Sequence, residues 1–575
     1  MKLSRLGVLS AAVLIGATFA GGLLGKRVLA GGGDLREELS VYTAMLAAIE
    51  RDYVEEVPTD RLVSSSIRQM LRTLDPHSNF FEQKDYKSMQ ERQKGKYYGL
   101  GISVQSIDGN ITVVAPFEGT PAHRLGIRAG DIISRIEGED ARGMSIDDAV
   151  KVLRGPKGTP IRITIVREGY DEPLAFTVIR DAIPLHSVPY AFMVSPSVGY
   201  IRLTDFNETT ACRPGEGEGC ERELERALTR LGTQGARAFV LDIRDNPGGL
   251  LDQAFAVSNL FLRKGQLVVF TRGRSRRDES NYITETESPW VDVPLVVLTS
   301  RHSASASEIV AGALQDHDRA LIVGETTFGK GLVQTLLPLR NVRGYALALT
   351  TARYYTPSGR SIQREYSSTA LEDYYAPRNR KPCDEGTGET RLTDSGRTVY
   401  GGDGITPDYC VEPQKPGRFV SHLIGRQAFV GFGRGFAPVG GQGEADIAGT
   451  GTRSHVESEG VKPISEAFTV DDGVREDFLA YLESRELRFT EEDLEENRVM
   501  VDRLIEEQVL RQVFGEGAAR RRSVAWDRQL QRALELIPRA ELLLGDPDGF
   551  VAERERERRL ADATRAEAGP AAAHQ

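Results

Sequence analysis

Short, uninterrupted runs of apolar residues mark the middle of this 575-residue chain. Such runs, bounded by turn residues, are typical of strands that are buried on both faces of a sheet. Here they cover residues 199–203, 238–243, 295–298, 321–323 and 345–350. Stretches with helical spacing lie between the early runs, at 221–231 and 251–260. Strands that alternate with helices predict an α/β domain, which we place at residues 183–415.

A helical pattern precedes this domain. Apolar residues recur every fourth position from Val41 to Tyr53, as on one face of a helix. Apolar residues between 62 and 74 predict a second helix, which Asp75-Pro76 would end. We interpret His77, in the turn that follows, as a structural loop residue. Residues 34–85 are therefore predicted to form an N-terminal helical region.

Helical spacing returns near the C-terminus. Apolar residues between 494 and 509 lie on one side of a predicted helix, which Thr490 would cap together with Asp493 and which Gly515 would end. We assign residues 463–550 to a C-terminal helical region. Its apolar faces require burial, either within the same subunit or against a partner in a homodimer formed through the terminal helices.

Two stretches lack such periodicity. Residues 416–462 become rich in Gly, Ser and Glu in their second half, which is typical of a flexible linker. Residues 551–575 are strongly charged and end in Ala-Ala-Ala-His-Gln, so we expect a disordered tail.

The first 30 residues form a separate unit. Lys2 and Arg5 precede an uncharged run from Leu6 to Gly25, which is long enough to span a bilayer as a helix. Val28-Leu29-Ala30 also offers a small-residue cleavage site, as in a secretory signal peptide. The basic residues between the run and that site favour an uncleaved anchor. Both interpretations export the rest of the chain.

The bulk composition excludes few classes of protein. The formal net charge of -10 argues against a nucleic-acid binder, which usually carries a basic face. Four cysteines, at positions 212, 220, 383 and 410, lack the spacing of a zinc site. In an exported protein they permit disulfides that close the loops 212–220 and 383–410, and free thiols remain the alternative.

Ser305 and Lys330 are the candidate catalytic residues. Ser305 falls between a predicted buried strand and a predicted helix, where free N–H groups at the helix N-terminus can stabilise an oxyanion. Lys330 lies in a glycine-flanked loop after the next strand. Burial would keep its amine neutral, as a general base for the serine requires. A Ser–His–Asp triad would need His302 with Asp245 or Asp316, but this order fits no familiar triad.

Residues 86–182 resemble a PDZ domain. The matching segments are Tyr98 to Val104, Gly119 to Ala122, and Leu125 to Ile133, followed by a helix that Ser145 would cap. A peptide would add to the adjoining strand edge while its carboxylate contacts backbone N–H groups. The residues assigned to this contact are Gly99, Leu100, Gly101 and Ile102.

Four segments, 242–249, 303–309, 324–331 and 354–362, resemble in order the motifs of the carboxyl-terminal processing peptidases, also called tail-specific proteases. The resemblance implies that Ser305 is the nucleophile, that Lys330 is the general base and that Gln334 orients the lysine. It also implies an oxyanion hole formed by the N–H groups of Ala306 and of a glycine, for which we choose Gly248 over Gly249.

The resemblance implies a multidomain α+β protein. Its protease core would have a crotonase-like or ClpP-like αβ fold, joined to a PDZ domain, an N-terminal helical region and a C-terminal helical extension. The predicted function is an exported serine endopeptidase, periplasmic or anchored to the outer face of a bacterial inner membrane. It would need no cofactor or metal and would act on proteins with free C-termini.

Two other classes of protein remain as alternatives. One is a catalytically silent PDZ scaffold, against which the intact Ser305, Lys330 and Gln334 set argues. The other is an acyl-CoA enzyme of the crotonase type, which would leave the PDZ domain and the export signal unexplained.

Overall fold

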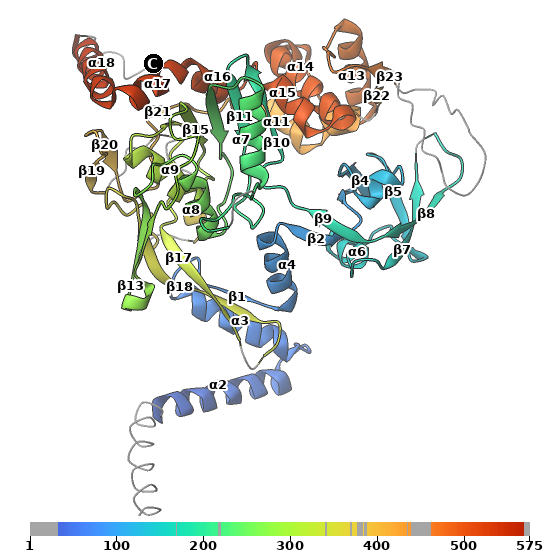
Figure 1. Cartoon of the computed structure of the whole chain (residues 1–575). Helices are drawn as coiled ribbons and strands as arrows, with labels where there is room; N and C mark the ends of the chain where they lie inside the picture. Colours follow the sequence, from blue (N-terminus) through green and yellow to red (C-terminus); the bar gives the residue numbers. More distant parts are fainter. Residues whose placement is uncertain are drawn as a thin grey trace, which may run out of the picture.

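The structure, a computed structural model, is multidomain and mixes helices with sheets (Figure 1). It describes residues 33–167, 169–216, 220–339, 342–367, 371–375, 383, 388–433, 435–438 and 462–567. The predicted signal or anchor therefore lies outside the described residues. Within those residues, each helix is too short or too polar to cross a bilayer.

The N-terminal region consists of three helices and one short strand. They are α2 (Gly33–Asp52), α3 (Thr59–Arg72), β1 (Asn79–Phe81) and α4 (Gln83–Gln93). The apolar face predicted for the first helix stays uncovered, because Val41 and Met45 are 52% and 60% exposed. The strand β1 was not predicted, and it attaches this region to the α/β domain by pairing with β18 (Ala346–Tyr355).

The domain predicted to resemble PDZ stands apart from the core in Figure 1. Two antiparallel strands, β2 (Lys96–Gly99) and β9 (Asp181–Pro184), connect it to the rest of the chain. Its sheet has the order β3-β4-β5-β7-β8, and β6 pairs with β5. The strands are β3 (Ile102–Ile107), β4 (Asn110–Pro116), β5 (Ile132–Ile136), β6 (Glu139–Asp140), β7 (Pro160–Val166) and β8 (Leu174–Ile179), and the helices are α5 (Pro121–Arg124) and α6 (Ile146–Leu153).

Ser145 is the N-cap of α6, as predicted, and its hydroxyl accepts a hydrogen bond from the Asp148 N–H. Alternate residues of β7, Ile161, Ile163 and Ile165, point into a shared apolar core and are essentially fully buried. The alternation gives this domain a hydrophobic core of its own, separate from that of the α/β domain.

The α/β domain contains a six-stranded sheet in the order β10-β11-β12-β15-β16-β21. All neighbouring pairs are parallel except β10 with β11. Its strands are β10 (Tyr190–Ser195), β11 (Val198–Arg202), β12 (Ala238–Asp242), β15 (Leu295–Thr299), β16 (Leu321–Gly324) and β21 (Tyr409–Cys410). Helices cover both faces of this sheet, which explains why its strands are continuous apolar runs in the sequence.

One face packs against α7 (Glu223–Thr233), α8 (Leu251–Asn259) and α9 (Ala306–Asp316). The other face packs against the last helices of the chain, α16 (Arg528–Glu535), α17 (Ile537–Gly545) and α18 (Pro547–Glu567). Leu530, Leu543 and Phe550 of these helices are buried against that face. The C-terminal faces are thus buried within the same subunit, one of the two expected alternatives.

A second sheet lies beside the first, in the order β1-β18-β13-β14, with β17 also paired to β18. Its other members are β13 (Leu267–Gly273), β14 (Ser280–Ile283) and β17 (Leu332–Pro338). β18 spans ten residues and contacts β1, β13 and β17. Short elements nearby are η1 (Arg276–Asp278), α10 (Leu371–Tyr375), β19 (Thr390–Leu392) and β20 (Thr398–Tyr400).

The remaining C-terminal elements form a separate bundle. They are α11 (Arg418–Gly425), α12 (Ala428–Gly433), β22 (Phe436–Pro438), β23 (Lys462–Ile464), α13 (Asp472–Ser484), α14 (Glu491–Phe514) and α15 (Glu516–Ser523). Thr490 and Asp493 form the predicted capping box of α14, and Gly515 follows its end with φ +84°.

Two predictions about flexible segments are wrong in part. Residues 418–433, inside the predicted linker, form α11 and α12 because Val420, Leu423 and Phe429 bury into the bundle. Residues 439–461 of the linker lie outside the described residues. The predicted disordered tail is helical to residue 567, since α18 inserts Phe550 against the sheet and its acidic residues pair with Arg539.

A buried ion cluster attaches the C-terminal helices to the α/β domain. Asp242 at the end of β12 is fully buried and accepts hydrogen bonds from Arg202 and Arg244. Arg244 also donates to both oxygens of Asp527, at 3.0 Å and 2.8 Å. The surrounding arginines hold the pKa of the Asp242 carboxyl well below its usual range despite its burial. The C-terminal region therefore contacts the chain immediately before the glycine-rich loop 246–249.

Candidate active site

Ser305 occupies a strained turn between β15 and α9. Its φ is +56° and its ψ is -111°, an uncommon conformation for a residue other than glycine. Gly248 approaches it closely: a Cβ at position 248 would lie 2.8 Å from the Ser305 Cβ and 2.7 Å from the Ala304 carbonyl oxygen. The loop 246–249 therefore requires a glycine here. The serine is partly exposed at the N-terminal end of α9, as predicted.

Lys330 follows β16 in the loop that leads into β17. Gly329 before it has φ +90°, and a Cβ there would lie 2.9 Å from Arg364 and 3.2 Å from the Gly404 nitrogen. The glycine thus lets the loop fold tightly onto the core, which leaves Lys330 partly buried. Burial lowers the pKa of the Lys330 amine, although the negative charges of Glu308 and Asp75 act in the opposite direction.

A buried carboxylate, Glu308, connects the serine turn to the lysine loop. Its Oε2 accepts hydrogen bonds from the N–H groups of Ser305 at 2.8 Å and of Lys330 at 2.9 Å. Its Oε1 accepts from the Gly329 N–H at 2.7 Å and from the Thr327 hydroxyl at 2.6 Å. Four donors to one side chain fix both segments relative to each other.

Glu308 is fully buried, and burial raises the pKa of its carboxyl. The four donors oppose that shift, because hydrogen bonds to a carboxylate favour its charged form. All four neighbours are donors, so both oxygens of Glu308 act as acceptors, as in an ionised carboxylate.

Tyr354, at the end of β18, contacts the same two residues from another direction. Its hydroxyl lies 3.2 Å from the Ser305 carbonyl oxygen and in short contact with the Lys330 carbonyl oxygen. The side chain is 1% exposed, and burial raises the pKa of the hydroxyl well above its usual value. Glu308 and Tyr354 together hold the main chain of Ser305 and Lys330 at both the N–H and the C=O groups.

The side chains of the predicted catalytic set are not hydrogen-bonded to one another. Among the described residues, neither the Ser305 hydroxyl nor Gln334 is bonded to the Lys330 amine. The Gln334 Nε2 instead donates to the Thr350 hydroxyl at 3.3 Å. The structure thus brings together the backbones of Ser305 and Lys330, and it places Gln334 in the adjoining strand at a register shift of β17 against β18.

The loop 246–249 supplies the candidate oxyanion donors. The Gly248 N–H already donates to the Asn246 Oδ1 at 2.9 Å. The N–H groups of Gly249 and Ala306, in contrast, have no acceptor among the described residues. The Gly249 N–H is thus available to an acceptor in this conformation, and the assignment of Gly248 as an oxyanion donor stays a prediction.

The histidine alternative has no geometric support. His302 is exposed, and within the described residues only its backbone is hydrogen-bonded, to Ser300. Asp245 accepts from the Ser300 hydroxyl, and Asp316 binds the buried guanidinium of Arg360 at 2.6 Å. These aspartates do not form a triad with His302 and Ser305.

Sequence reasoning missed the roles of Glu308, Tyr354 and the loop 75–78. Glu308 and Tyr354 lie within the quoted motifs, but a glutamate and a tyrosine in the sequence do not indicate that both contact the main chains of Ser305 and Lys330. His77 was assigned to a structural loop, and its Nε2 lies 2.8 Å from the Tyr374 hydroxyl. Burial and the nearby charge of Lys330 lower the pKa of His77 to about 3, so this histidine is neutral close to the lysine.

The predicted peptide-binding loop joins β2 to β3. Gly99 belongs to β2, the Leu100 side chain is 2% exposed, and Gly101 has φ +80°. The N–H groups of Leu100 and Gly101 find no acceptor in the described part of the chain. Ile102 begins β3, which is an edge strand, and α6 packs beside it. Free N–H groups beside a sheet edge can bind a peptide carboxylate.

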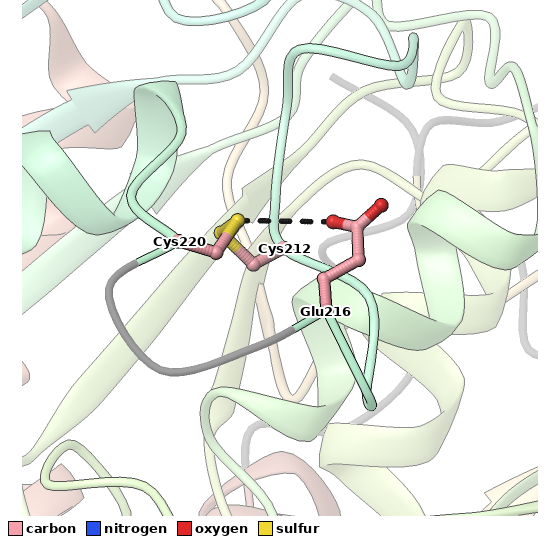
Figure 2. A group of neighbouring side chains, drawn as sticks. All are labelled: Cys212, Glu216 and Cys220. Carbon is pink, nitrogen blue, oxygen red and sulfur yellow. Dashed lines mark hydrogen bonds between the residues drawn. A yellow bond between two sulfur atoms is a disulfide. The ribbon is translucent and has the colours of Figure 1, made fainter.

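One cluster among the described residues has the donor types of a metal site: Cys212, Glu216 and Cys220 (Figure 2). The two cysteines form a disulfide, and Glu216 Oε2 lies 3.7 Å from the Cys220 sulfur. A disulfide has no thiolate to offer a metal, so the cluster does not suit a zinc ion. Cys383 and Cys410 form a second disulfide, and both loops predicted as closable are closed.

Comparisons with known proteins agree with these motifs. Residues 197–369 match peptidase family S41, and residues 112–167 match the PDZ domain. The chain is 42% identical over 327 residues to a carboxy-terminal-processing protease of Bartonella bacilliformis, covering 57% of this chain and 73% of that protein. It is 35% identical over 318 residues to the carboxy-terminal processing protease CtpA of Bacillus subtilis, covering 55% and 65%. A solved photosystem II D1 C-terminal processing protease is 28% identical, with a TM-score of 0.31, covering 56% and 89%.

Proposed function

Because this chain belongs to peptidase family S41 and is a serine-type carboxyl-terminal processing peptidase, we propose that it cleaves its substrates with a Ser305–Lys330 dyad. The supporting observation is the shared hydrogen bonding of the two residues to Glu308. A base that serves a serine must be held near it, and Glu308 fixes both main chains. The lowered pKa of Lys330 supplies the neutral amine that the reaction needs.

In the proposed reaction, the Lys330 amine removes the proton of the Ser305 hydroxyl as the oxygen attacks the substrate carbonyl. The tetrahedral intermediate collapses to an acyl-enzyme, and the lysine passes the proton to the leaving amine. Water, activated by the same amine, then releases the acyl group. Gln334 orients the lysine through its amide oxygen, the end of the side chain that Thr350 does not hold.

The negative oxygen of the intermediate lies at the N-terminal end of α9. The Ala306 N–H is one donor, and the glycine loop supplies the second, from Gly249 in the present conformation or from Gly248 once Asn246 releases it. Each such donor contributes about 3–4 kcal/mol to transition-state stabilisation in related chemistry.

The PDZ domain recruits the substrate tail in this proposal. The free C-terminal carboxylate binds the N–H groups of Leu100 and Gly101, and the preceding residues pair with the edge strand β3. The relatives' names refer to carboxy-terminal processing, which suits a protease that selects substrates by their tails. Protein substrates with free C-termini are therefore the expected partners.

Export is part of the same proposal. Two disulfides within the described residues suit an oxidising compartment such as the periplasm. Residues 1–30 would serve as signal peptide or as membrane anchor. The mass of the purified protein distinguishes a signal peptide from an anchor. A cleaved signal peptide lowers the mass below that of the full chain, and an uncleaved anchor in a membrane fraction leaves it unchanged. A protein found only in the cytoplasm would contradict export.

A homodimer would form through the N-terminal helices, since the C-terminal ones bury their apolar faces internally. The exposed side chains of α2 carry this proposal, and Met45→Glu on that face should dissociate the dimer in analytical ultracentrifugation. A wild-type chain that sediments as a monomer would contradict it.

Covalent labelling tests the dyad directly. A fluorophosphonate should modify the wild-type protein at Ser305, and the labelled peptide identifies the site by mass spectrometry. Ser305→Ala should take up no label, and Lys330→Ala should take it up far more slowly. The buried hydroxyl of Ser258 donates to a helix carbonyl, so Ser258→Ala is the matched control and should label like wild type. Equal labelling of Ser305→Ala would contradict the proposed nucleophile.

A further inference from the structure

We propose that the loop Asp75-Pro76-His77-Ser78 is a positioning element of the active site, which holds Gln334 in place through Ser78 and Thr350. The proposal rests on the Ser305–Lys330–Gln334 assignment above and extends it to the N-terminal helical region. That region would then be needed for the chemical step itself.

Hydrogen bonds hold the loop, in which Asp75 and Ser78 are buried and Pro76 and His77 are half-buried. Asp75 is 6% exposed, and its Oδ1 accepts from the N–H groups of His77 at 2.7 Å and Ser78 at 2.8 Å. The Ser78 hydroxyl donates to the Asp75 Oδ2 at 2.7 Å. From the protease core, the Tyr375 hydroxyl donates to the Pro76 carbonyl oxygen at 2.6 Å. The loop is therefore fixed both internally and against the core.

Ser78 connects the loop to β18. A hydroxyl has one hydrogen and two lone pairs, and Asp75 takes the hydrogen of Ser78. One lone pair accepts from the Thr350 N–H at 3.1 Å. The Thr350 hydroxyl in turn accepts from the Gln334 Nε2 at 3.3 Å. The Ser78 and Thr350 hydroxyl oxygens also lie 3.5 Å apart. Ser78 thus links Asp75 to Thr350, whose hydroxyl contacts Gln334.

The backbone arrangement explains why this path is well ordered. β1 follows the loop directly and pairs with the first residues of β18, Ala346 to Ala348. On the other side of β18, the register against β17 shifts between Val333 and Gln334, so that Gln334 lies opposite Thr350. Such an irregularity re-aims a side chain. An ordinary turn that only ends a helix would need Asp75, but it would need no bond to Thr350.

Asp75 also acts on Lys330 through its charge. The charged or titratable groups that act on the Lys330 amine are Glu308 of α9 and Asp75, both of which favour its protonated form. His77 is the third titratable group close by, and it stays neutral because burial and the charges of Lys330 and Arg364 outweigh that of Asp75. Removing the charge of Asp75 should therefore ease deprotonation of the lysine.

Thr350→Val tests the path with a matched control one residue away. It removes the hydroxyl that accepts from Gln334 and keeps a β-branched side chain. Thr351→Val removes a neighbouring hydroxyl whose one partner in the described part of the chain is the Thr335 hydroxyl on β17, at 2.7 Å. With a fixed peptide substrate, we expect Thr350→Val to lower kcat on the order of tenfold with KM nearly unchanged, because misplaced catalytic groups slow the chemical step. Thr351→Val should match wild type.

Two loop variants complete the test. Ser78→Ala should lower kcat as Thr350→Val does, and Ser78→Thr, which restores the hydroxyl, should recover part of the activity. Asp75→Asn keeps an acceptor for the loop N–H groups but removes the charge, so the acid limb of the kcat–pH profile should move to lower pH. Thermal melting curves show which variants are folded, and kcat is compared only among those. If Ser78→Ala does not fold, Thr350→Val carries the test alone.

Equal kcat in Thr350→Val and Thr351→Val would overturn the positioning role, and an unmoved pH profile in Asp75→Asn would overturn the charge effect of Asp75 on Lys330. Ser305→Ala and Lys330→Ala are measured in parallel. If they are inactive while Thr350→Val resembles its control, the dyad stands and the inference from the loop fails. If they are active, the dyad itself is wrong.

Discussion

The main-chain N–H groups of Ser305 and Lys330 donate to the same carboxylate oxygen, Oε2 of Glu308, at 2.8 Å and 2.9 Å. The relative position of the two residues thus depends on one buried side chain as well as on the sheet that carries them. A change at Glu308 would therefore displace Ser305 and Lys330 relative to each other.

Ser305→Ala and Lys330→Ala should each abolish cleavage of an unfolded protein. Neither group works without the other, so the double variant should be no worse than either single variant. Initial rates of the three variants, measured with the same substrate, check this expectation. Losses that simply add in free energy would show that the two residues act independently.

Activity should rise with pH as Lys330 loses its proton. The reactive form is the neutral amine, and burial lowers the pKa of that amine, so the midpoint should lie below the ordinary lysine value of about 10.4. Acid protonates the amine and silences the enzyme. A kcat–pH profile provides the measurement, and Lys330→Arg should be inactive throughout because arginine keeps its charge. A profile that is flat from mildly acidic to alkaline pH would exclude a lysine base.

Glu308→Gln should reduce kcat by on the order of a hundredfold, because the amide offers NH₂ to donors where the carboxylate offered oxygen. Leaving buried donors unpaired should also cost about 1–3 kcal/mol of folding stability for each lost bond. Steady-state kinetics and thermal melts measure both effects. Glu223→Gln, which removes another carboxylate that accepts a backbone N–H, is the control and should keep kcat. Normal turnover in Glu308→Gln would show that the dyad does not depend on the hydrogen bonds of this carboxylate.

Tyr354→Phe removes only the hydroxyl that contacts the carbonyl oxygens of Ser305 and Lys330. We expect kcat to fall roughly tenfold and stability to change by about 1 kcal/mol, the usual net contribution of one hydrogen bond. Tyr282→Phe, in β14, serves as a control for loss of a tyrosine hydroxyl. The prediction fails if the two variants turn over substrate equally fast.

The PDZ domain should distinguish a free C-terminus from an amidated one. Hydrogen bonds to an ionised acceptor are roughly twice as strong as neutral ones, and amidation removes that charge. Calorimetry on the full-length Ser305→Ala protein, which binds without cleaving, should show tighter binding of the free-acid peptide. Equal affinities for the acid and the amide would contradict recognition of the substrate's C-terminal carboxylate, and they would not contradict the protease activity.

The strands of the protease core were predictable because burial on both faces makes them continuous apolar runs, as in β12 and β15. Ser305 and Lys330 were recognisable from their motifs. The links between them were not, since a glutamate and a tyrosine become partners of the same two backbones only when α9 and β18 are brought together. The strand β1 escaped prediction because three residues carry no periodicity, yet it places the 75–78 loop against the site.

The flexible segments were mispredicted for a related reason. Glycine dominates the composition of 431–435, and charged residues dominate the chain beyond residue 551. The residues whose burial makes these segments helical, such as Phe432 and Phe550, are few. These side chains are buried against residues distant in the sequence, which the local composition does not reveal.

The salt bridge between Arg244 and Asp527 has a consequence for the order in which the structure can be assembled. The two residues are 283 positions apart, and Arg244 lies two residues before Asn246, where the glycine loop 246–249 begins. During synthesis the ribosome delivers the serine and the lysine long before Asp527. A nascent chain therefore contains Arg244 and Asp242 before it contains Asp527, the second carboxylate that Arg244 binds. The contact between the C-terminal helices and this end of β12 can form only after nearly the whole polypeptide has been made.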